Sequence, residues 1–242
     1  MNTNLTKPTS IDPSQSVGHI AINVPGATAI FRRLKIDFCC GGQKSLLFAA
    51  KEKSLDLVSV LEELETLQRQ PMADTSSLPT DELIEMIVSR FHEAHRKQLP
   101  ELARMAARVE AVHRDHPHVP KGLAEFLEEM AVELVSHMAK EEQVLFPMMK
   151  RGGAPMIEAP IDVMRHEHVS HGDRLETLER LTDGFTPPSS ACNTWRALFN
   201  GLAALHDDLI EHVHLENNVL FPRFEQNLSS PDNTRHASTP AR

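Results

Sequence analysis

The chain has 242 residues, 40% of them hydrophobic, which is enough for one large domain or for a small and a medium-sized domain. Its net charge of −9 excludes the extended basic face that a nucleic-acid partner requires. Three cysteines do not make a disulfide framework, and neither a signal-like start nor a membrane-length apolar run is present, so we expect a soluble, cytoplasmic protein without membrane contact.

The first 70 residues show the pattern of short helices. Residues 1–14 are polar and are expected to be a flexible lead-in to a helical domain over 15–70. Helices are expected at residues 17–21, 27–34, 45–53 and 55–70. The paired glycines of Phe38-Cys39-Cys40-Gly41-Gly42 predict a turn. A domain of this size is marginal alone, so we expect it to dock on the rest of the chain or to form a homodimer with a second chain.

Four long helices are expected after a linker at residues 71–79. They span residues 80–114, 121–149, 160–182 and 191–226. Connections of ordinary length join them, and the sequence has no alternating apolar and polar pattern of a strand. We therefore predict an all-α fold, with a small helical domain before an up-down-up-down four-helix bundle over 80–226 and a flexible tail at 228–242.

One stretch of the second long helix returns in the fourth. His137 and Glu141 return as His212 and Glu216, and each copy continues as Val-Leu-Phe-Pro. A His and a Glu four residues apart lie one turn apart on the same helix face. Both pairs fall on apolar stripes, the first of which continues through Val144, so they are expected in the core. Because an unpaired buried carboxylate is costly, a cation between the pairs is the simplest explanation.

The other two long helices supply further histidines. His92 and His95 lie on the core stripe of the first helix, and His168 and His171 lie on that of the third. Folding the helices back on one another leaves both pairs open, with a slight preference for His168. His113 would lie about 25 Å from the site at a rise of 1.5 Å per residue and is rejected.

Four imidazoles and two carboxylates exceed what one tetrahedral zinc ion needs. Mixed nitrogen and oxygen ligands with open positions favour two bridged metal ions, and iron in particular. Residues 80–226 resemble the hemerythrin-like di-iron bundles, and Asp37-Phe38-Cys39-Cys40-Gly41-Gly42 resembles the signature of the ScdA-type N-terminal domain. The two in this order resemble the repair of iron centres (RIC) family.

This resemblance implies a centre of two non-haem iron ions bridged by carboxylates, with an oxo bridge as a further option. It favours His92 over His95. The ligands that it implies are His92, His137, Glu141, His168, His212 and Glu216. His95 and His171 are left as neighbours of the ligands. Glu133 and Glu167 are candidate proton or iron relays, with a solvated role preferred.

Cys39 and Cys40 are candidates for redox or iron-transfer thiols, or for acceptors of nitric oxide. They precede a predicted helix, whose amide groups are expected to lower a thiol pKa. Adjacent cysteines are expected to point in different directions and to chelate one metal ion poorly. A purely structural pair is the alternative, and Cys192 is expected to be a packing residue.

The resemblance implies repair of iron–sulfur clusters damaged by nitric oxide or peroxide, with damaged or apo iron–sulfur proteins as partners. We favour an iron donor. The alternatives are a di-iron oxidoreductase that reduces nitric oxide or nitrite, and a hemerythrin-like sensor that binds O2 or nitric oxide. All of them need the same ligands. Turnover with a supplied reductant would indicate an enzyme, whereas iron loss coupled to cluster recovery would indicate a donor.

Overall fold

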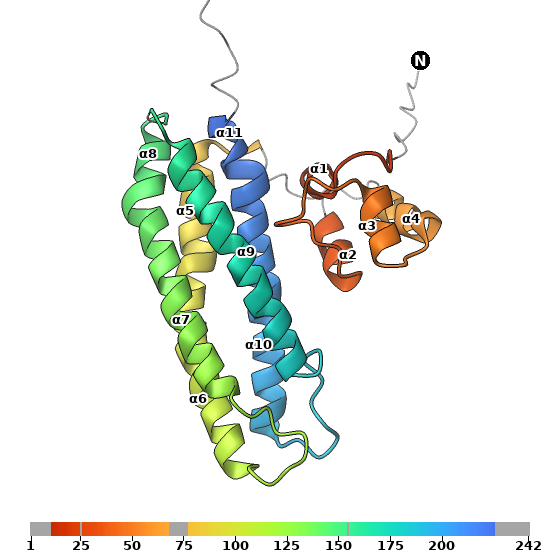
Figure 1. Cartoon of the computed structure of the whole chain (residues 1–242), viewed down its shortest axis with the longest axis vertical. Coiled ribbons are helices and arrows are strands. Elements are labelled where there is room, and N and C mark those ends of the chain that lie inside the picture. The colour runs from red at the N-terminus through yellow and green to blue at the C-terminus, as the bar shows by residue number, and fades with distance from the viewer. Residues whose placement is uncertain (1–10, 25, 68–76, 154, 226–242) are drawn as a thin grey trace, which may run out of the picture.

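The computed structural model describes residues 11–24, 26–67, 77–153 and 155–225. Within these ranges the elements are all helices, and the one pairing of extended backbone is an isolated bridge between Ser16 and Ser45. The all-α prediction is therefore confirmed. Figure 1 shows a rod of long helices with a smaller helical domain beside it. The expectations for residues 1–10, for the linker at 71–76 and for the tail at 228–242 lie outside the described residues.

Four short helices make up the small domain. They are α1 (Val17–Asn23), α2 (Ala27–Arg33), α3 (Leu46–Glu52) and α4 (Leu57–Leu67). Ser16 and Ser45 cap α1 and α3, because each hydroxyl oxygen accepts a backbone N–H at 3.2 Å. The prediction of a loose lead-in is wrong for residues 11–14, because the apolar side chain of Ile11 is buried in the core of this domain.

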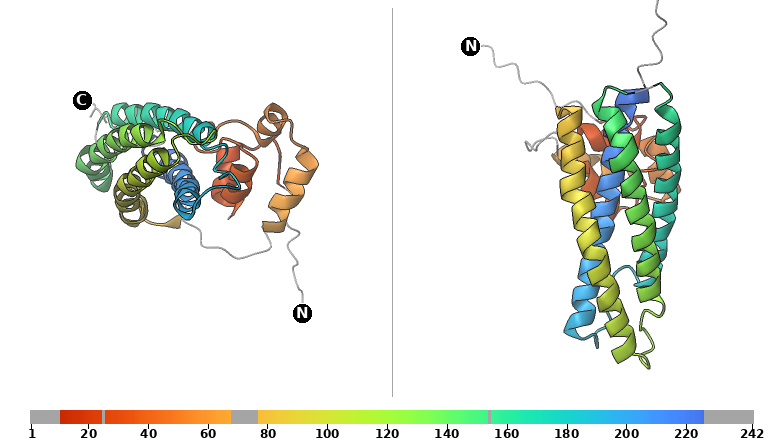
Figure 2. Two further views of the ribbon diagram at one scale, coloured as in Figure 1. Left: turned by 90° about the horizontal axis from the view of Figure 1, so that it is seen from below. Right: turned by 90° about the vertical axis from the view of Figure 1, so that its left-hand side faces the viewer.

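The bundle consists of four helical rods, and three of them contain a π-helical segment between α-helical ones. The first rod is α5 (Thr80–Ile87), η2 (Val88–His92) and α6 (Glu93–Val112); the second is α7 (Leu123–Lys140), η3 (Glu141–Leu145) and α8 (Phe146–Lys150); the third is α9 (Glu158–Leu181); the fourth is α10 (Asn193–His214), η4 (Leu215–Leu220) and α11 (Pro222–Glu225). Figures 1 and 2 show each rod running opposite to the one before it, and both α6 and α9 pack on α7 and α10. None of the helices in the described ranges is long and apolar enough to cross a membrane.

The π-helical segments η2, η3 and η4 change which residues face the core. A π-helical turn contains one residue more than an α-helical turn, so it rotates the residues that follow around the helix axis. The predicted burial of Val144 is wrong for this reason. Val144 is 52% exposed, and Leu145 takes its place in the core at 1%. The extra residue lets Glu141 and the apolar residues beyond it face the same interior.

A buried polar layer divides the bundle core into two apolar halves. Leu134 and Leu209 belong to one half, and Leu145 and Leu215 belong to the other. Six polar side chains between them are each at most 1% exposed: His92, His137, Glu141, His168, His212 and Glu216. Four rods therefore hold one polar layer between two rigid apolar walls.

The small domain docks on η4 of its own bundle. The side-chain amides of Asn217 and Asn218 donate to the carbonyls of Cys39 and Phe38, at 3.0 and 3.1 Å. The ring of Phe38 lies edge-on against His214, with centroids 5.1 Å apart. The bundle thus supplies a partner surface for the small domain, and this docking does not require the second chain of a homodimer.

Glycines permit the close approach at this contact. A Cβ on Gly42 would lie 2.7 Å from Asn218 Oδ1 and equally close to the carbonyl oxygen of Phe38. A Cβ on Gly18 would lie 2.8 Å from the same Asn218 oxygen. The second glycine of the Cys-Cys-Gly-Gly turn is therefore required both by the turn itself and by docking.

We expect Gly42→Ala to loosen docking while both bodies stay folded. Overpacking of this kind costs about 1–3 kcal/mol, so hydrogen exchange of residues 38–42 is expected to accelerate. Gly172→Ala in α9 is the matched control, because an added Cβ there meets nothing within 4 Å. The control is expected to be neutral or to stabilise the helix by about 0.5–1 kcal/mol. Equal exchange of residues 38–42 in the two variants would contradict this account of docking.

Candidate metal centre

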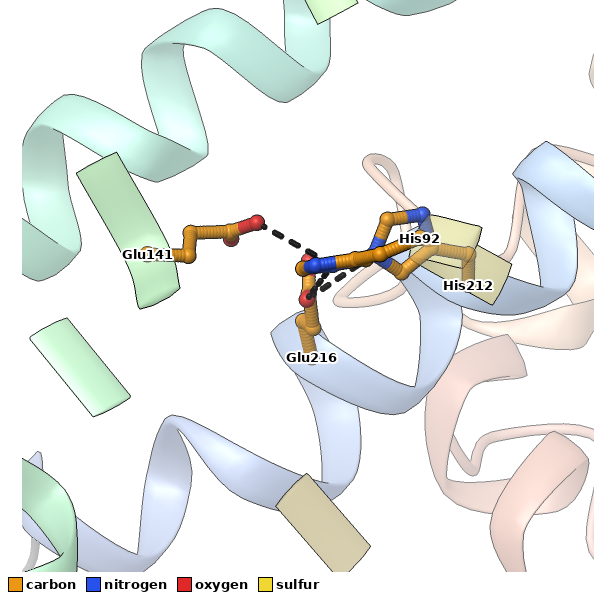
Figure 3. A group of neighbouring side chains, drawn as sticks. All are labelled: His92, Glu141, His212 and Glu216. Carbon is orange, nitrogen blue, oxygen red and sulfur yellow. Dashed lines mark hydrogen bonds and ion pairs between the residues drawn. The ribbon is translucent and has the colours of Figure 1, made fainter. Parts of the chain in front are cut away.

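The first group of candidate ligands comes from three rods. His92 of η2, Glu141 of η3, and His212 and Glu216 of the fourth rod converge in Figure 3. The Nε2 atoms of His92 and His212 are 3.0 Å apart. His212 Nε2 lies 3.0 Å from Glu216 Oε1, and His92 Nε2 lies 3.5 Å from Glu141 Oε2. These atoms surround one buried point, as the ligands of a metal ion do.

The second group uses the same two glutamates from the other side. His137 of α7 and His168 of α9 bring their Nε2 atoms within 3.1 Å of each other. Glu141 Oε1 lies 3.4 Å from His137 Nε2, and Glu216 Oε2 lies 3.1 Å from His168 Nε2. Each carboxylate therefore turns one oxygen toward each group, which is the arrangement of bridging carboxylates in di-metal bundles.

Hydrogen bonds on the outer side fix which nitrogen of each ring carries a proton. Glu142 Oε1 lies 2.7 Å from His92 Nδ1, and Glu167 Oε2 lies 2.8 Å from His137 Nδ1. An ionised carboxylate can only accept, so both rings carry Nδ1–H, and in the neutral form Nε2 is the unprotonated nitrogen that faces inward. This is the orientation of a metal-binding imidazole with a carboxylate behind it.

In the neutral form that binds a metal ion, the inward nitrogens are all acceptors. His168 Nδ1–H donates to Asn217 Oδ1 at 2.8 Å, so its Nε2 is an acceptor as well. The Nε2 atoms of His137 and His168, 3.1 Å apart, then have no donor between them unless a proton or a cation lies there. No hydrogen bond reaches either oxygen of Glu141. Because buried acceptors without donors are costly, the residues fit a bound cation.

Without a cation, the centre attracts protons. Burial is the largest single influence and lowers the pKa of His137, but the charges and hydrogen bonds of Glu141, Glu216 and Glu167 together outweigh it and raise that pKa to about 9. The pKa of His92 is likewise raised against burial, by Glu216 and Glu141. These nitrogens must lose their protons before they bind a metal ion, so metal affinity rises with pH.

The repeated stretch also orients the two histidines that lie outside it. Phe146 and Phe221 of the two Val-Leu-Phe-Pro copies stack on His92 and His168, with centroids 5.8 and 5.9 Å apart. The residue after each shared glutamate accepts from Nδ1 of that same histidine. An approximate two-fold axis therefore relates the half of the centre around His92 to the half around His168.

The thiol loop of the small domain reaches the edge of this centre. Cys40 S–H donates to the backbone carbonyl of His168 at 3.6 Å. The carbonyl of Cys39 accepts from Asn217, the same amide that holds His168. One side chain thus connects the Cys-Cys-Gly-Gly turn to a candidate metal ligand.

Two family models match the sequence. The hemerythrin HHE cation binding domain matches residues 84–224, and ScdA_N, a domain of unknown function, matches residues 13–68. The iron-sulfur cluster repair protein YtfE of Citrobacter koseri is 48% identical, over 86% of this chain and 96% of that protein. The proteins of the same name from Cronobacter sakazakii and Escherichia coli are 49% identical, over 86% of this chain and 95% and 96% of theirs.

The chain belongs to the YtfE family. The resemblance to the repair of iron centres family and to a hemerythrin-like bundle is therefore confirmed. The match over the bundle covers all the candidate ligands described above. The match over the small domain includes the two thiols at the docking contact.

The expected lowering of the thiol pKa in this YtfE-family chain is wrong for Cys39. No helix begins directly after the turn, because α3 starts only at Leu46. The hydrogen bond with Cys40, burial, and the negative charges of Cys40 and Asp37 hold the pKa of Cys39 well above its ordinary value of 9.0. Its thiol is therefore protonated at neutral pH.

We expect alkylation of Cys39 to be slow at neutral pH and to accelerate only above the ordinary thiol pKa of 9.0. Thiolate is the nucleophile, so a raised pKa lowers the rate. Asp37→Asn removes a neighbouring negative charge and is expected to lower the pKa and speed alkylation at neutral pH several-fold. Cys192→Ser is the background for both proteins, because Cys192 is exposed. An alkylation rate that Asp37→Asn leaves unchanged would contradict the charge argument.

Two further buried histidines lie beside the ligands. His95 lies 5.4 Å from His212 and His171 lies 4.7 Å from His137, measured between ring centroids. Burial and the neighbouring histidines lower the pKa of His95 to about 2 and that of His171 to about 3. Both rings are therefore neutral, and neither is a member of the two ligand groups.

His113, which was rejected on distance, lies at the far end of the bundle. Its ring centroid is 5.2 Å from that of Trp195, and its Nε2 is 3.2 Å from Cys192 Sγ. The expectation that Cys192 is a packing residue is wrong. Cys192 precedes the first turn of α10, where the chain enters the bundle from the surface, and its side chain is exposed.

A cavity of about 810 Å³ lies between α7 and α9. Its lining includes Glu133, Ser136, Lys140, Glu167 and His171. The expectation of a solvated side chain is wrong for Glu167, because its carboxylate accepts from both His137 and Lys140. Glu133 is exposed and accepts from Arg174 at 3.0 Å. The cavity therefore reaches the partner of one candidate ligand from the surface.

Sequence reasoning missed the residues that support the ligands and the docking contact. Glu142, Asn217 and Asn218 carry these contacts, yet none lies on an apolar stripe. The signal was present where the two copies of the repeat differ, as Glu142-Gln143 against Asn217-Asn218. The second copy departs from the first at the positions that bind the small domain.

Proposed function

We propose that the chain holds two non-haem iron ions bridged by Glu141 and Glu216. We propose further that it repairs iron–sulfur clusters damaged by nitrosative or oxidative stress, by donating iron in the cytoplasm. The observation that most supports this is that each carboxylate offers one oxygen to each pair of histidines. The relatives named above are iron-sulfur cluster repair proteins. The partners of this chain are then damaged or apo iron–sulfur proteins.

The chain's own residues are suited to hold iron and to release it. Iron supplies redox and Lewis-acid chemistry, and imidazole with carboxylate is a suitable ligand set for it. Glu142 and Glu167 orient His92 and His137 through their Nδ1–H groups. The pKa values of both histidines are raised, so protons compete with the metal for the inner nitrogens and favour its release.

Transfer of labelled iron tests the donor function directly. The chain is loaded with isotopically enriched iron and mixed with a [4Fe–4S] enzyme that nitric oxide has damaged. We expect the client to regain activity while enriched iron moves from the chain into the rebuilt cluster. Recovery with no enriched iron in the client would exclude donation.

A di-iron oxidoreductase is the second candidate, and the cavity between α7 and α9 favours it. A small oxidant such as nitric oxide or nitrite could reach the centre's edge beside Glu167 and His171. The enzyme would consume nitric oxide over many cycles with a supplied reductant and would keep its iron. The donor would lose iron in proportion to the clusters repaired.

A further inference from the structure

We propose that Asp37, Cys39 and Cys40 form a second metal site, which takes one thiophilic divalent cation. Ligand atoms of all three residues lie within 4.8 Å of one another. Cys39 Sγ lies 3.7 Å from Cys40 Sγ and 3.5 Å from Asp37 Oδ1. The expectation that adjacent cysteines point apart is therefore wrong for this pair. That the cation is iron in transit rests on the proposed function; the site itself does not.

These distances are those of ligands around a tetrahedral ion. Sulfur binds zinc-like ions at about 2.3 Å and carboxylate oxygen at about 2.0 Å. At a tetrahedral angle, two such sulfurs stand about 3.8 Å apart, and a sulfur and an oxygen about 3.5 Å apart. The observed 3.7 and 3.5 Å agree with both values. A cation fits among the three atoms with little movement of the chain.

The backbone of the turn holds the carboxylate in place for this role. Cys40 N–H donates to Asp37 Oδ1 at 3.0 Å. A Cβ on Gly41 would lie 2.7 Å from Asp37 Oδ2 and would push the carboxylate from this position. Gly41 therefore leaves space for the side chain of Asp37, whereas Gly42 leaves space for that of Asn218. The Cys-Cys-Gly-Gly turn combines two ligands with the two glycines that position their neighbours.

The three groups also favour a cation by charge. Ionising Cys39 places it beside Asp37 and Cys40, where negative charge accumulates. A divalent cation relieves this repulsion, and the two thiols release two protons when they bind it. Three protein ligands leave the fourth tetrahedral position for water or for a ligand of a client protein. Such a site can accept and pass on a metal ion.

The position of Cys40 links this site to the bundle. Its S–H donates to the carbonyl of His168, and the thiol gives up this proton when its sulfur binds a cation. The hydrogen-bonded and metal-bound states of this thiol are mutually exclusive. Filling the second site therefore removes one of the contacts that hold the thiol loop against the bundle.

Cobalt titration of the full chain tests the second site. The reduced protein is first loaded with iron without oxygen, its iron content is measured, and Co2+ is then added. We expect one Co2+ per chain to give the sulfur-to-cobalt charge-transfer absorption of a thiolate complex, with release of two protons. Nitrogen and oxygen ligands in the bundle cannot give this absorption. Cys192→Ser is the matched control and is expected to keep the absorption.

Variants of the three residues decide the assignment. Cys39→Ser and Cys40→Ser are each expected to lose most of the sulfur-to-cobalt absorption. Asp37→Asn is expected to keep it but to weaken Co2+ binding by roughly tenfold or more. No thiolate absorption in the unaltered chain, or an absorption that persists in Cys39→Ser with Cys40→Ser, would overturn the second site. Iron content before the titration reports separately on the bundle, so either site can fail without the other.

Discussion

Glu141→Gln with Glu216→Gln is expected to reduce the iron content from two ions per chain to almost none. Each carboxylate serves both ligand groups, so its loss weakens both positions at once. The fall in affinity is expected to exceed the roughly 10–100-fold that follows loss of a residue behind a metal ligand. Elemental analysis measures the loss, together with the near-ultraviolet absorption of the iron centre.

The same variant is expected to fold but to be less stable than the unaltered chain when both are metal-free. Glu141 and Glu216 raise the pKa of His137 and His92, and removing one partner of a buried ion pair costs about 3–5 kcal/mol. A thermal melt of the two metal-free proteins therefore separates loss of ligands from misfolding. Glu142→Gln is the matched control, because it removes a carboxylate that contacts His92 and Arg96 but belongs to neither ligand group. Iron content unchanged by the double variant, or stoichiometric zinc in the unaltered chain, would contradict the bridging assignment.

Cys39→Ala with Cys40→Ala is expected to keep both iron ions in the bundle and to abolish repair of a damaged client. Neither thiol belongs to the two bundle ligand groups, and Cys40 Sγ contacts only the backbone carbonyl of His168 by a hydrogen bond, at 3.6 Å, and not its ring. Loss of the sulfurs therefore leaves the centre's ligands intact. Client activity and iron content, measured on the same sample, test the two halves of this expectation.

Cys192→Ala provides the comparison for a thiol outside the loop. It is exposed at the far end of the bundle beside His113, so its loss is expected to leave repair unchanged. If the double variant at residues 39 and 40 repaired clients fully, the thiol loop would have no part in the function. If it lost iron as well, the loop would instead stabilise the bundle centre through Asn217.

The six candidate ligands could be found from the sequence because a polar pair stands out on an apolar stripe. The repeat around His137 and His212 identified the ligands on two rods. The position of histidines on apolar stripes, together with the family resemblance, identified those on the other two. All six side chains meet in one buried layer. Helical periodicity could not predict which residues after Glu141 face the core, because no residue type identifies a π-helical turn in a sequence. Val144 and Leu145 exchanged places for that reason.

The thiol loop was misjudged because its geometry depends on contacts across the chain. Local sequence suggested two cysteines pointing apart in front of a helix. In the structure, Asp37 and the glycine that accommodates it bring the sulfurs together, and α3 begins too late to influence them. The role of Asn217 was equally hidden, since it joins a carbonyl and an imidazole 178 and 49 residues away along the chain.

Because the metal centre has an approximate two-fold axis, the small domain could in principle bind the bundle in two orientations. A duplicated bundle presents two similar faces, around η3 and η4, yet the small domain binds only the second. Glu142 and Gln143 occupy the positions on the first face that Asn217 and Asn218 occupy on the second. A carboxylate cannot donate to the carbonyl of Cys39, so the first face rejects the thiol loop. The small domain thus takes a single orientation because the two copies of the repeat have diverged, and a bundle with Asn-Asn in both copies would present two competing docking faces.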